Sequence, residues 1–167
     1  MRYQDGPTTE VEVHVDAPPA AVWPLVCDVD LPSHFSSEFV RGQWTEGGGP
    51  ALGARFTGHN QHSAVGQWQT SCVVVEYEPE RRFGWAVGDP ERPSALWRFE
   101  LEPEDGGTRL RQWMRLGPGP SYLSDIVGRM PDREEQIIDR RVAEHRANME
   151  ATLRGIKATA ERSPATP

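Results

Sequence analysis

The chain has 167 residues, a hydrophobic fraction of 37% and a formal net charge of −7, with a pI near 5.2. This length fits one domain and is long enough to bury a core without disulfide or metal staples. The acidic balance repels nucleic acids and anionic membranes, so neither is an expected partner.

Cysteine use and the N-terminal composition indicate a compartment. Cys27 and Cys72 follow no metal or redox spacing, and we interpret them as buried reduced thiols, which suits a cytosol. The first residues lack a basic start followed by an apolar stretch, so we expect no signal peptide. No apolar run approaches the roughly 20 residues that span a bilayer. We therefore expect a cytoplasmic protein without stable membrane association.

The first part of the chain predicts one strand and two short helices. Residues 1–8 are polar and are expected to be flexible. Residues 10–15 alternate strictly between polar and apolar types, as a half-buried strand does. Pro18 and Pro19 suit a first helical turn, and residues 31–37 predict a second short helix.

Strand patterns dominate from residue 39 to residue 116. Alternation, Thr, Val and Trp content and intervening turn residues predict six further strands, with the strongest hairpin signal at Asp105-Gly106-Gly107. His59 and His62 are expected in an exposed hairpin end, without the carboxylate or thiol that a metal site would add. The six expected strands span residues 39–45, 54–58, 67–77, 82–87, 95–102 and 108–116.

Pro131 and Asp132 open the strongest predicted helix, after a short helical turn over residues 122–130. Its mixed charges, including the run 139–141, predict a solvated face with local ion pairs. The tail over residues 161–167 is expected to be disordered, which leaves residues 9–160 as the folded domain. An apolar stripe with the 3.6-residue period runs through Ile138, Val142, His145, Met149, Leu153 and Ile156.

A helix segregated to one face of an antiparallel sheet is the α+β architecture. The order of several short motifs then resembles the START-like, Bet v 1-like (SRPBCC) superfamily, in its polyketide cyclase/dehydrase branch. The motifs lie at residues 13–18, 22–23, 28, 66–68, 78–83, 106–108 and 146–150, and the resemblance covers residues 9–160.

The resemblance implies a helix-grip fold, in which a curved antiparallel sheet of six or seven strands wraps around the long C-terminal helix. It also implies a deep cavity for aromatic polyketides, lipids, hormones or related apolar molecules, with no cofactor and no metal. Aromatase/cyclases of this kind carry a cavity arginine where this chain has Cys72, and a tyrosine where it has Phe39. Both polar groups that would steer an aldol cyclisation are absent from those places.

Strand alternation and the helix stripe predict which side chains line the cavity and contact the ligand. Aromatic walls suit flat polycyclic ligands, because they offer a large stacking area at low entropic cost. The alternative is that the same side chains fill a solid core. The predicted set is Phe39, Phe56, Asn60, Trp68, Thr70, Cys72, Trp85, Trp97, Phe99, Gln112, Met114, His145 and Met149.

Four members of this set, Asn60, Thr70, Gln112 and His145, are polar on otherwise apolar faces. A buried polar group without a partner costs about 1–3 kcal/mol, so a ligand group, a water or a backbone group must satisfy each one. His145, Gln112 and Thr70 are the weak catalytic candidates, since no nucleophile, base and acid trio is recognisable. Cys72 is expected to be unreactive, because an apolar strand raises a thiol's pKa.

Three functions remain open from the sequence. The first is a binding protein that carries or sequesters an aromatic polyketide-type molecule, for biosynthesis of an antibiotic or self-resistance to it. The second is a polyketide cyclase, aromatase or dehydratase of secondary metabolism. The third is a protein-interaction module, which the acidic charge and aromatic interior support least. We expect a monomer or weak homodimer.

Overall fold

The computed structural model describes residues 1–45 and 48–162. Seven strands form one antiparallel sheet in the order β1-β7-β6-β5-β4-β3-β2. The strands are β1 (Thr8–Val15), β2 (Phe39–Trp44), β3 (Arg55–His62), β4 (Gly66–Glu78), β5 (Arg82–Val87), β6 (Ala95–Glu104) and β7 (Gly107–Leu116). The helices are η1 (Tyr3–Asp5), α1 (Pro19–Val26), η2 (Leu31–His34), α2 (Tyr122–Arg129), η4 (Pro131–Arg133) and α3 (Glu134–Arg162).

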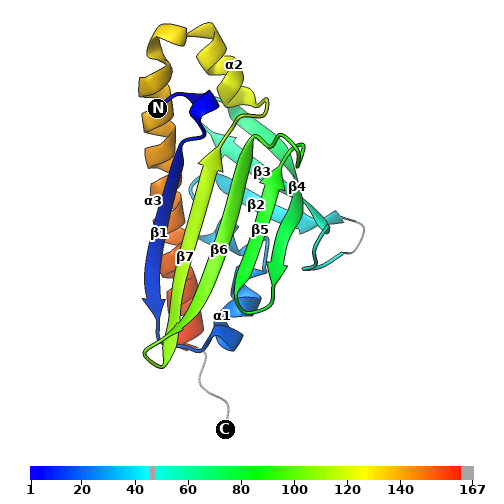
Figure 1. Ribbon diagram of the computed structural model, residues 1–167, viewed down its shortest axis with the longest axis vertical. Coiled ribbons are helices and arrows are strands. Elements are labelled where there is room, and N and C mark those ends of the chain that lie inside the picture. The colour runs from blue at the N-terminus through cyan, green and yellow to red at the C-terminus, as the bar shows by residue number, and fades with distance from the viewer. Residues whose placement is uncertain (46–47, 163–167) are drawn as a thin grey trace.

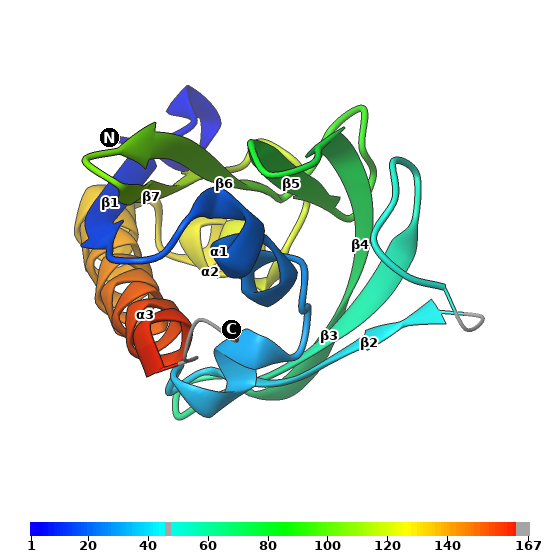
Figure 2. The same cartoon turned by 90° about the horizontal axis from the view of Figure 1, so that it is seen from below.

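The sheet curls around the long helix α3, which runs beside β1 (Figure 1). Viewed along α3, the strands follow an arc from β1 to β2, and α3 occupies the open side of that arc (Figure 2). Helix α1 lies towards one end of the enclosed space and α2 towards the other. The predicted helix-grip arrangement is confirmed, with two short helices, α1 and η2, after the first strand.

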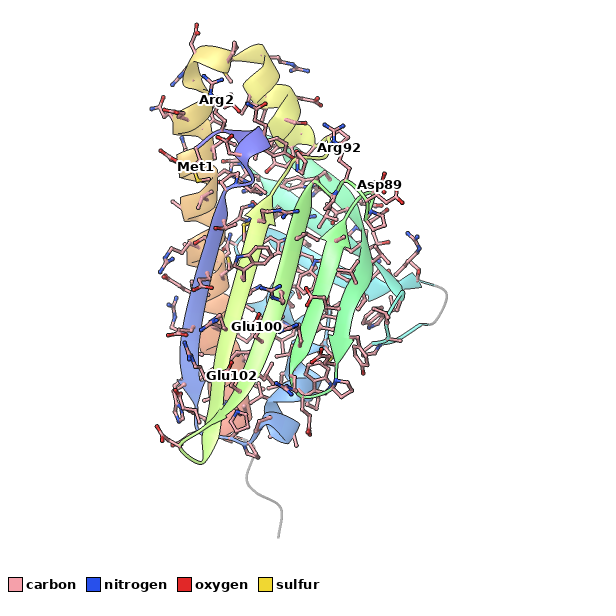
Figure 3. The ribbon with its side chains drawn as sticks, in the orientation of Figure 1. Met1, Arg2, Asp89, Arg92, Glu100 and Glu102 are labelled. Carbon is pink, nitrogen blue, oxygen red and sulfur yellow. The ribbon has the colours of Figure 1, made fainter. Side chains whose placement is uncertain are left out.

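Strand alternation separates an apolar inner face from a charged outer face. On β7, Leu110, Met114 and Leu116 are buried on the inner face. On the outer face, Glu100 of β6 pairs with Arg98 at 2.8 Å, within a series of ion pairs that crosses several strands (Figure 3). The inner face is therefore the one that packs against α3 and forms the core.

Both ends of the described chain are more ordered than their composition predicts. Residues 1–8 were expected to be flexible, but Tyr3 is buried and its hydroxyl donates to the Gly119 carbonyl at 2.6 Å. The buried Tyr3 ring holds the N-terminal segment against the fold, although the polar residues around Tyr3 do not predict this packing. Helix α3 continues to Arg162, and residues 163–167 of the expected tail lie outside the described part of the chain.

The strand β3 is longer than predicted. Its pairing with β4 continues through His59 and His62, which were expected to lie at an exposed hairpin end. The second half of β3 is polar throughout, so it lacks the alternation of apolar and polar residues that predicts a strand. The longer β3 brings His62 within reach of α3.

Candidate functional site

A cavity of about 570 Å³ lies between the inner face of the sheet and helix α3. Val26 of α1 and Pro32 of η2 line it at one end, and Tyr122 and Leu123 of α2 line it at the other. Its volume falls within the range of sites that enclose drug-sized molecules. One helix spans the curved sheet without filling the space beneath it.

Aromatic rings form the central wall of this cavity. Trp85 of β5 and Trp97 of β6 are opposite each other in register, and their rings stack with centroids 6.1 Å apart and planes 10° apart. Phe56 of β3 packs edge-on against Trp85 with ring centroids 5.8 Å apart, and Phe99 of β6 is tilted against it at 6.0 Å. These four side chains present a continuous aromatic surface that a flat apolar molecule could cover.

The structure places every predicted cavity residue except Met114 on the cavity wall. Met114 points to the inner face of β7 but is fully buried in the hydrophobic core, in register with Thr9 of β1 and Trp97 of β6. Alternation correctly assigned its face of the sheet. It does not distinguish a side chain that reaches the open space from one packed beneath α3.

Two glycines make room for Phe39 in the wall. Gly42 of β2 and Gly58 of β3 are paired across the strands. A Cβ atom on Gly58 would lie 3.1 Å from the Phe39 ring and 2.7 Å from the Thr70 hydroxyl oxygen, and one on Gly42 would lie 3.1 Å from the same ring. The missing side chains therefore let Phe39 lie against the sheet beside Thr70.

Two polar side chains of the wall are buried and neutral. Gln112 of β7 is 5% exposed, and its Oε1 has no hydrogen-bond partner among the described residues. His145 of α3 packs edge-on against Trp97, with ring centroids 5.3 Å apart. Burial, and then the nearby Arg141 and His62, hold the pKa of His145 well below its ordinary value, so the ring is uncharged at neutral pH.

Thr70 and Cys72 lie next to each other on the inner face of β4. The Thr70 hydroxyl donates to the Gly58 carbonyl at 3.4 Å, and the Cys72 thiol lies 3.8 Å from the Thr70 oxygen. Burial raises the pKa of Cys72 to about 12, although its contact with Thr70 acts in the opposite direction. The thiol is therefore protonated at neutral pH and is a weak nucleophile.

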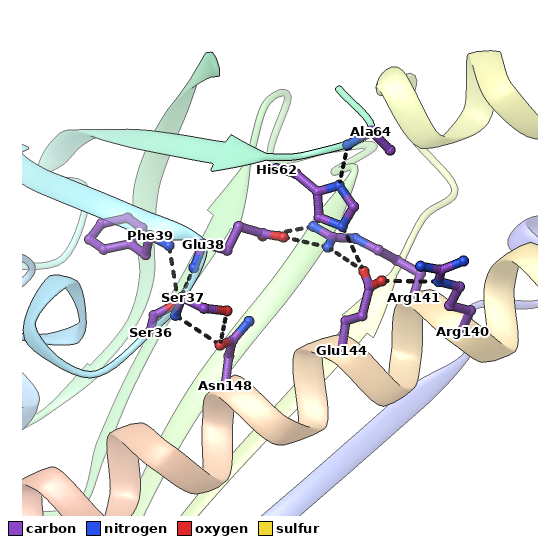
Figure 4. A network of polar contacts seen from close by, with 10 residues as sticks. All are labelled: Ser36, Ser37, Glu38, Phe39, His62, Ala64, Arg140, Arg141, Glu144 and Asn148. Atoms are coloured by element: carbon purple, nitrogen blue, oxygen red, sulfur yellow. Dashed lines mark hydrogen bonds and ion pairs between the residues drawn. The ribbon is translucent and has the colours of Figure 1, made fainter. Parts of the chain in front are cut away.

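An ion-pair network joins α3 to the strand edge at the cavity rim (Figure 4). Arg141 donates from Nη1 and Nη2 to the two carboxylate oxygens of Glu38, and from Nη1 to Glu144 at 3.2 Å. The Ala64 amide donates to His62 Nδ1, so His62 Nε2 can donate to Glu144 at 3.1 Å. Arg141 was expected on a solvated helix face; it is buried instead, because Glu38 reaches it from across the fold.

The segment that precedes β2 is fastened to α3 at two further places. The amide and the hydroxyl of Ser37 each donate to Asn148 Oδ1 at 3.0 Å. The Phe35 ring lies over Gly155, where an added Cβ atom would come within 2.5 Å of it. Residues 35–38, here called the closing segment, therefore cover the side of the cavity between η2 and α3.

Arg141 and Tyr122 line the cavity but were not predicted to do so. Arg141 lies four residues before His145, so helical spacing alone could have placed it on the inward stripe. The Tyr122 ring packs against Trp68 with centroids 4.8 Å apart and planes tilted by 56°, and it lies beneath the Arg141 guanidinium. Burial raises its pKa to about 12. The sequence of α2, the short helix that carries Tyr122, does not indicate which part of the fold it packs against.

The described residues contain no group of three or more His, Cys, Asp or Glu side chains arranged to hold a metal ion. Within the same residues, none of the helices has the length and apolar character required to span a membrane. Among the described residues, the charged groups of the wall are the Arg141 guanidinium and the Glu38 carboxylate, which are paired with each other, and the Asp28 carboxylate.

Comparisons with known proteins agree with this geometry. A family model described as polyketide cyclase / dehydrase and lipid transport matches residues 7–161. The solution NMR structure of the Polyketide_cyc-like protein Cgl2372 from Corynebacterium glutamicum is 29% identical, covers 97% of this chain and 98% of that one, and has a TM-score of 0.64. No curated protein matches the chain.

Two more distant structures share the fold. The di-domain ARO/CYC BexL from the BE-7585A biosynthetic pathway is 17% identical, with a TM-score of 0.70, and the match covers 95% of this chain and 51% of BexL. Ara h 8.0201 is 15% identical, with a TM-score of 0.59 and coverage of 93% and 97%.

Proposed function

The chain belongs to the polyketide cyclase / dehydrase and lipid transport family, and we propose that its cavity binds a flat, apolar, aromatic polyketide-type molecule without changing it covalently. The observation that carries this proposal is the cavity of about 570 Å³ with its wall of stacked and tilted aromatic rings. Affinity would come mainly from apolar burial, at about 25 cal/mol per Å², less the cost of ordering the partners.

The state of the polar wall residues favours binding over chemistry. His145 is neutral and makes no hydrogen bond to any described residue that would orient it as a base. Cys72 is a protonated thiol, and Arg141 is occupied by Glu38 and Glu144. A binder of this kind could carry a biosynthetic intermediate through the cytoplasm or sequester a toxic product.

Tryptophan fluorescence tests the proposal directly. Polycyclic aromatics should quench the emission of the wild-type protein in a saturable manner. Replacing Trp85 and Trp97 together by alanine should weaken affinity by at least about 10-fold, because both stacking faces are lost. Trp113→Ala is the matched control, since Trp113 stacks with Arg98 and does not line the cavity. Unchanged affinity in the double variant would overturn an aromatic-lined site.

A second candidate is cyclisation or dehydration of a polyketide chain, which the family description favours. The cavity would fold the chain, and Thr70, Gln112 or His145 would polarise carbonyls or transfer protons. Mass spectrometry of a poly-β-keto thioester incubated with the protein distinguishes the two functions. Turnover that is lost in Gln112→Met or His145→Gln would favour the enzyme, and binding without turnover would favour the carrier.

A further inference from the structure

Gln112 lines the cavity and carries a buried acceptor atom that has no hydrogen-bond partner among the described residues. Its Oε1 accepts no hydrogen bond from any described residue, although the side chain is 95% buried and lines the cavity. Buried side-chain polar atoms in folded proteins are rarely left in this state. The terminal torsion of glutamine is soft, so the carboxamide can turn its oxygen towards the open space.

The surroundings of Gln112 restrict which group could satisfy it. Gln112 is opposite Phe99 in register, and Phe99 lies two residues from Trp97, against which the neutral His145 packs. Arg141 is the only cationic residue among the described residues of the wall, and it is paired with Glu38 and Glu144. A carboxylate placed beside Gln112 would therefore lose its hydration without gaining a free counter-charge.

The chemistry of an acceptor oxygen then selects the ligand group. A carbonyl or an ether on the ligand could accept only from the Gln112 amide nitrogen and would leave Oε1 unpaired, as a hydrocarbon would. A hydroxyl can donate to it while remaining uncharged. We propose that the cavity selects neutral hydroxylated aromatic molecules, and that Gln112 determines this specificity by accepting a hydrogen bond from the ligand hydroxyl. This inference rests on the proposed binding function.

Three pyrenes of similar shape provide the test at pH 7, where a phenol is protonated and a carboxylic acid is ionised. The wild-type protein should bind 1-hydroxypyrene roughly 3- to 10-fold more tightly than 1-methylpyrene, as expected for one added hydrogen bond. It should bind pyrene-1-carboxylate at least about 10-fold more weakly than 1-methylpyrene.

Gln112→Met keeps the length of the side chain and removes both polar groups. In this variant 1-hydroxypyrene should bind no better than 1-methylpyrene, while the affinity for 1-methylpyrene stays within about 2-fold of wild type. Gln136→Met is the matched control, because Gln136 is exposed on α3 and does not line the cavity. It should retain the preference for the hydroxylated probe. If Gln112→Met folds poorly, Gln112→Leu provides the same comparison.

The outcomes separate this inference from the proposed function. Equal wild-type affinities for the hydroxyl and methyl probes, or a preference that survives removal of Gln112, would overturn the inference and leave the binding function standing. Tight binding of the carboxylate would also overturn it. Failure of all three probes to bind would overturn the proposed function, and the inference with it.

Discussion

Arg141 of α3 holds the carboxylate of Glu38, which immediately precedes β2, with an Nη2 to Oε2 distance of 2.7 Å. The two residues are 103 positions apart in the chain, and both side chains are almost inaccessible to solvent. The pair fastens the closing segment to the helix at the rim of the cavity. Its loss should therefore affect both stability and access to the cavity.

Arg141→Met should lower the free energy of unfolding by about 3–5 kcal/mol, because it leaves the Glu38 carboxylate buried without its partner. Urea denaturation measures this change. Arg140→Met is the matched control: the Arg140 side chain is 81% exposed, and its pair with Glu144 is worth about 0–1 kcal/mol. Equal effects of the two substitutions would contradict the structural role of Arg141.

Replacing both partners should be much less harmful than replacing one. The double variant Glu38→Leu with Arg141→Met removes the buried charges together, and should recover most of the stability lost in Arg141→Met alone. Glu38→Leu, Arg141→Met, the double variant and the wild type form a double-mutant cycle. A double variant as unstable as the sum of the singles would mean that the two residues act independently.

Gln112→Met should stabilise the ligand-free protein by about 1 kcal/mol, since it replaces a buried acceptor without a partner by an apolar side chain of similar length. Thermal and urea unfolding without ligand give the value. A destabilised variant would indicate that Gln112 has a partner in solution, such as a water held in the cavity.

The neutral His145 should make the protein less stable as the pH falls. In the unfolded chain this imidazole binds a proton below its ordinary pKa of 6.5, whereas burial and then Arg141 and His62 prevent this in the folded state. Acid therefore favours unfolding, by up to about 1.4 kcal/mol for each pH unit below 6.5. Urea unfolding at pH 7 and pH 5 should show a larger loss in wild type than in His145→Gln.

The comparison with His145→Gln also removes the contributions of other groups. The pKa of His14 is raised by its hydrogen bond to Glu104, so His14 favours folding as the pH falls, equally in both proteins. Burial raises the pKa of Glu144, but hydrogen bonds from Arg141 and His62 outweigh burial and leave the pKa below its ordinary value of 4.5. Protonation of Glu144 therefore begins to destabilise the fold only below about pH 4.5. Identical pH slopes in the two proteins would disprove the assignment to His145.

The two cysteines should report ligand binding differently. Burial raises the pKa of both thiols to about 12, so at pH 8 a thiol reagent should modify the folded protein at least about 100-fold more slowly than the urea-unfolded chain. Cys72 lines the cavity and Cys27 does not. A bound polycyclic aromatic should slow labelling of Cys72 in Cys27→Ser, with no change at Cys27 in Cys72→Ser. Equal protection of both would argue against occupancy of this cavity.

Most of the sheet could be predicted because its alternation is strict. On β7, Leu110, Gln112 and Met114 alternate with Arg109, Arg111, Trp113 and Arg115, and this period of two fixes which side chains face α3. The same rule placed Trp85 and Trp97 on the cavity wall. It worked best on β1, β6 and β7, where the inner face is mostly apolar and the outer face carries most of the charged side chains.

The rest depended on contacts between distant segments. Arg141 lies on the inward stripe of α3, but from the sequence alone a charged residue there is expected to face solvent. Its burial depends on Glu38, which is 103 positions away in the chain. The second half of β3 carries His59, Asn60 and His62, whose polarity conceals a strand that is held by pairing with β4. Tyr3 is buried by a contact with Gly119, more than 100 residues away.

The hydrogen bonds around β2 have a consequence for self-association. As the last strand of the sheet, β2 could offer its outer amides to another chain. The Phe39 amide instead donates to Ser36 Oγ at 3.0 Å, and the Gly42 amide donates to Asp30 Oδ1 at 2.9 Å. A Cβ atom on Gly42 would lie only 2.0 Å from the Val29 carbonyl oxygen, so local backbone already crowds this border. Sheet extension across β2, and the fibrous aggregation that such extension begins, is therefore obstructed by the protein's own chain.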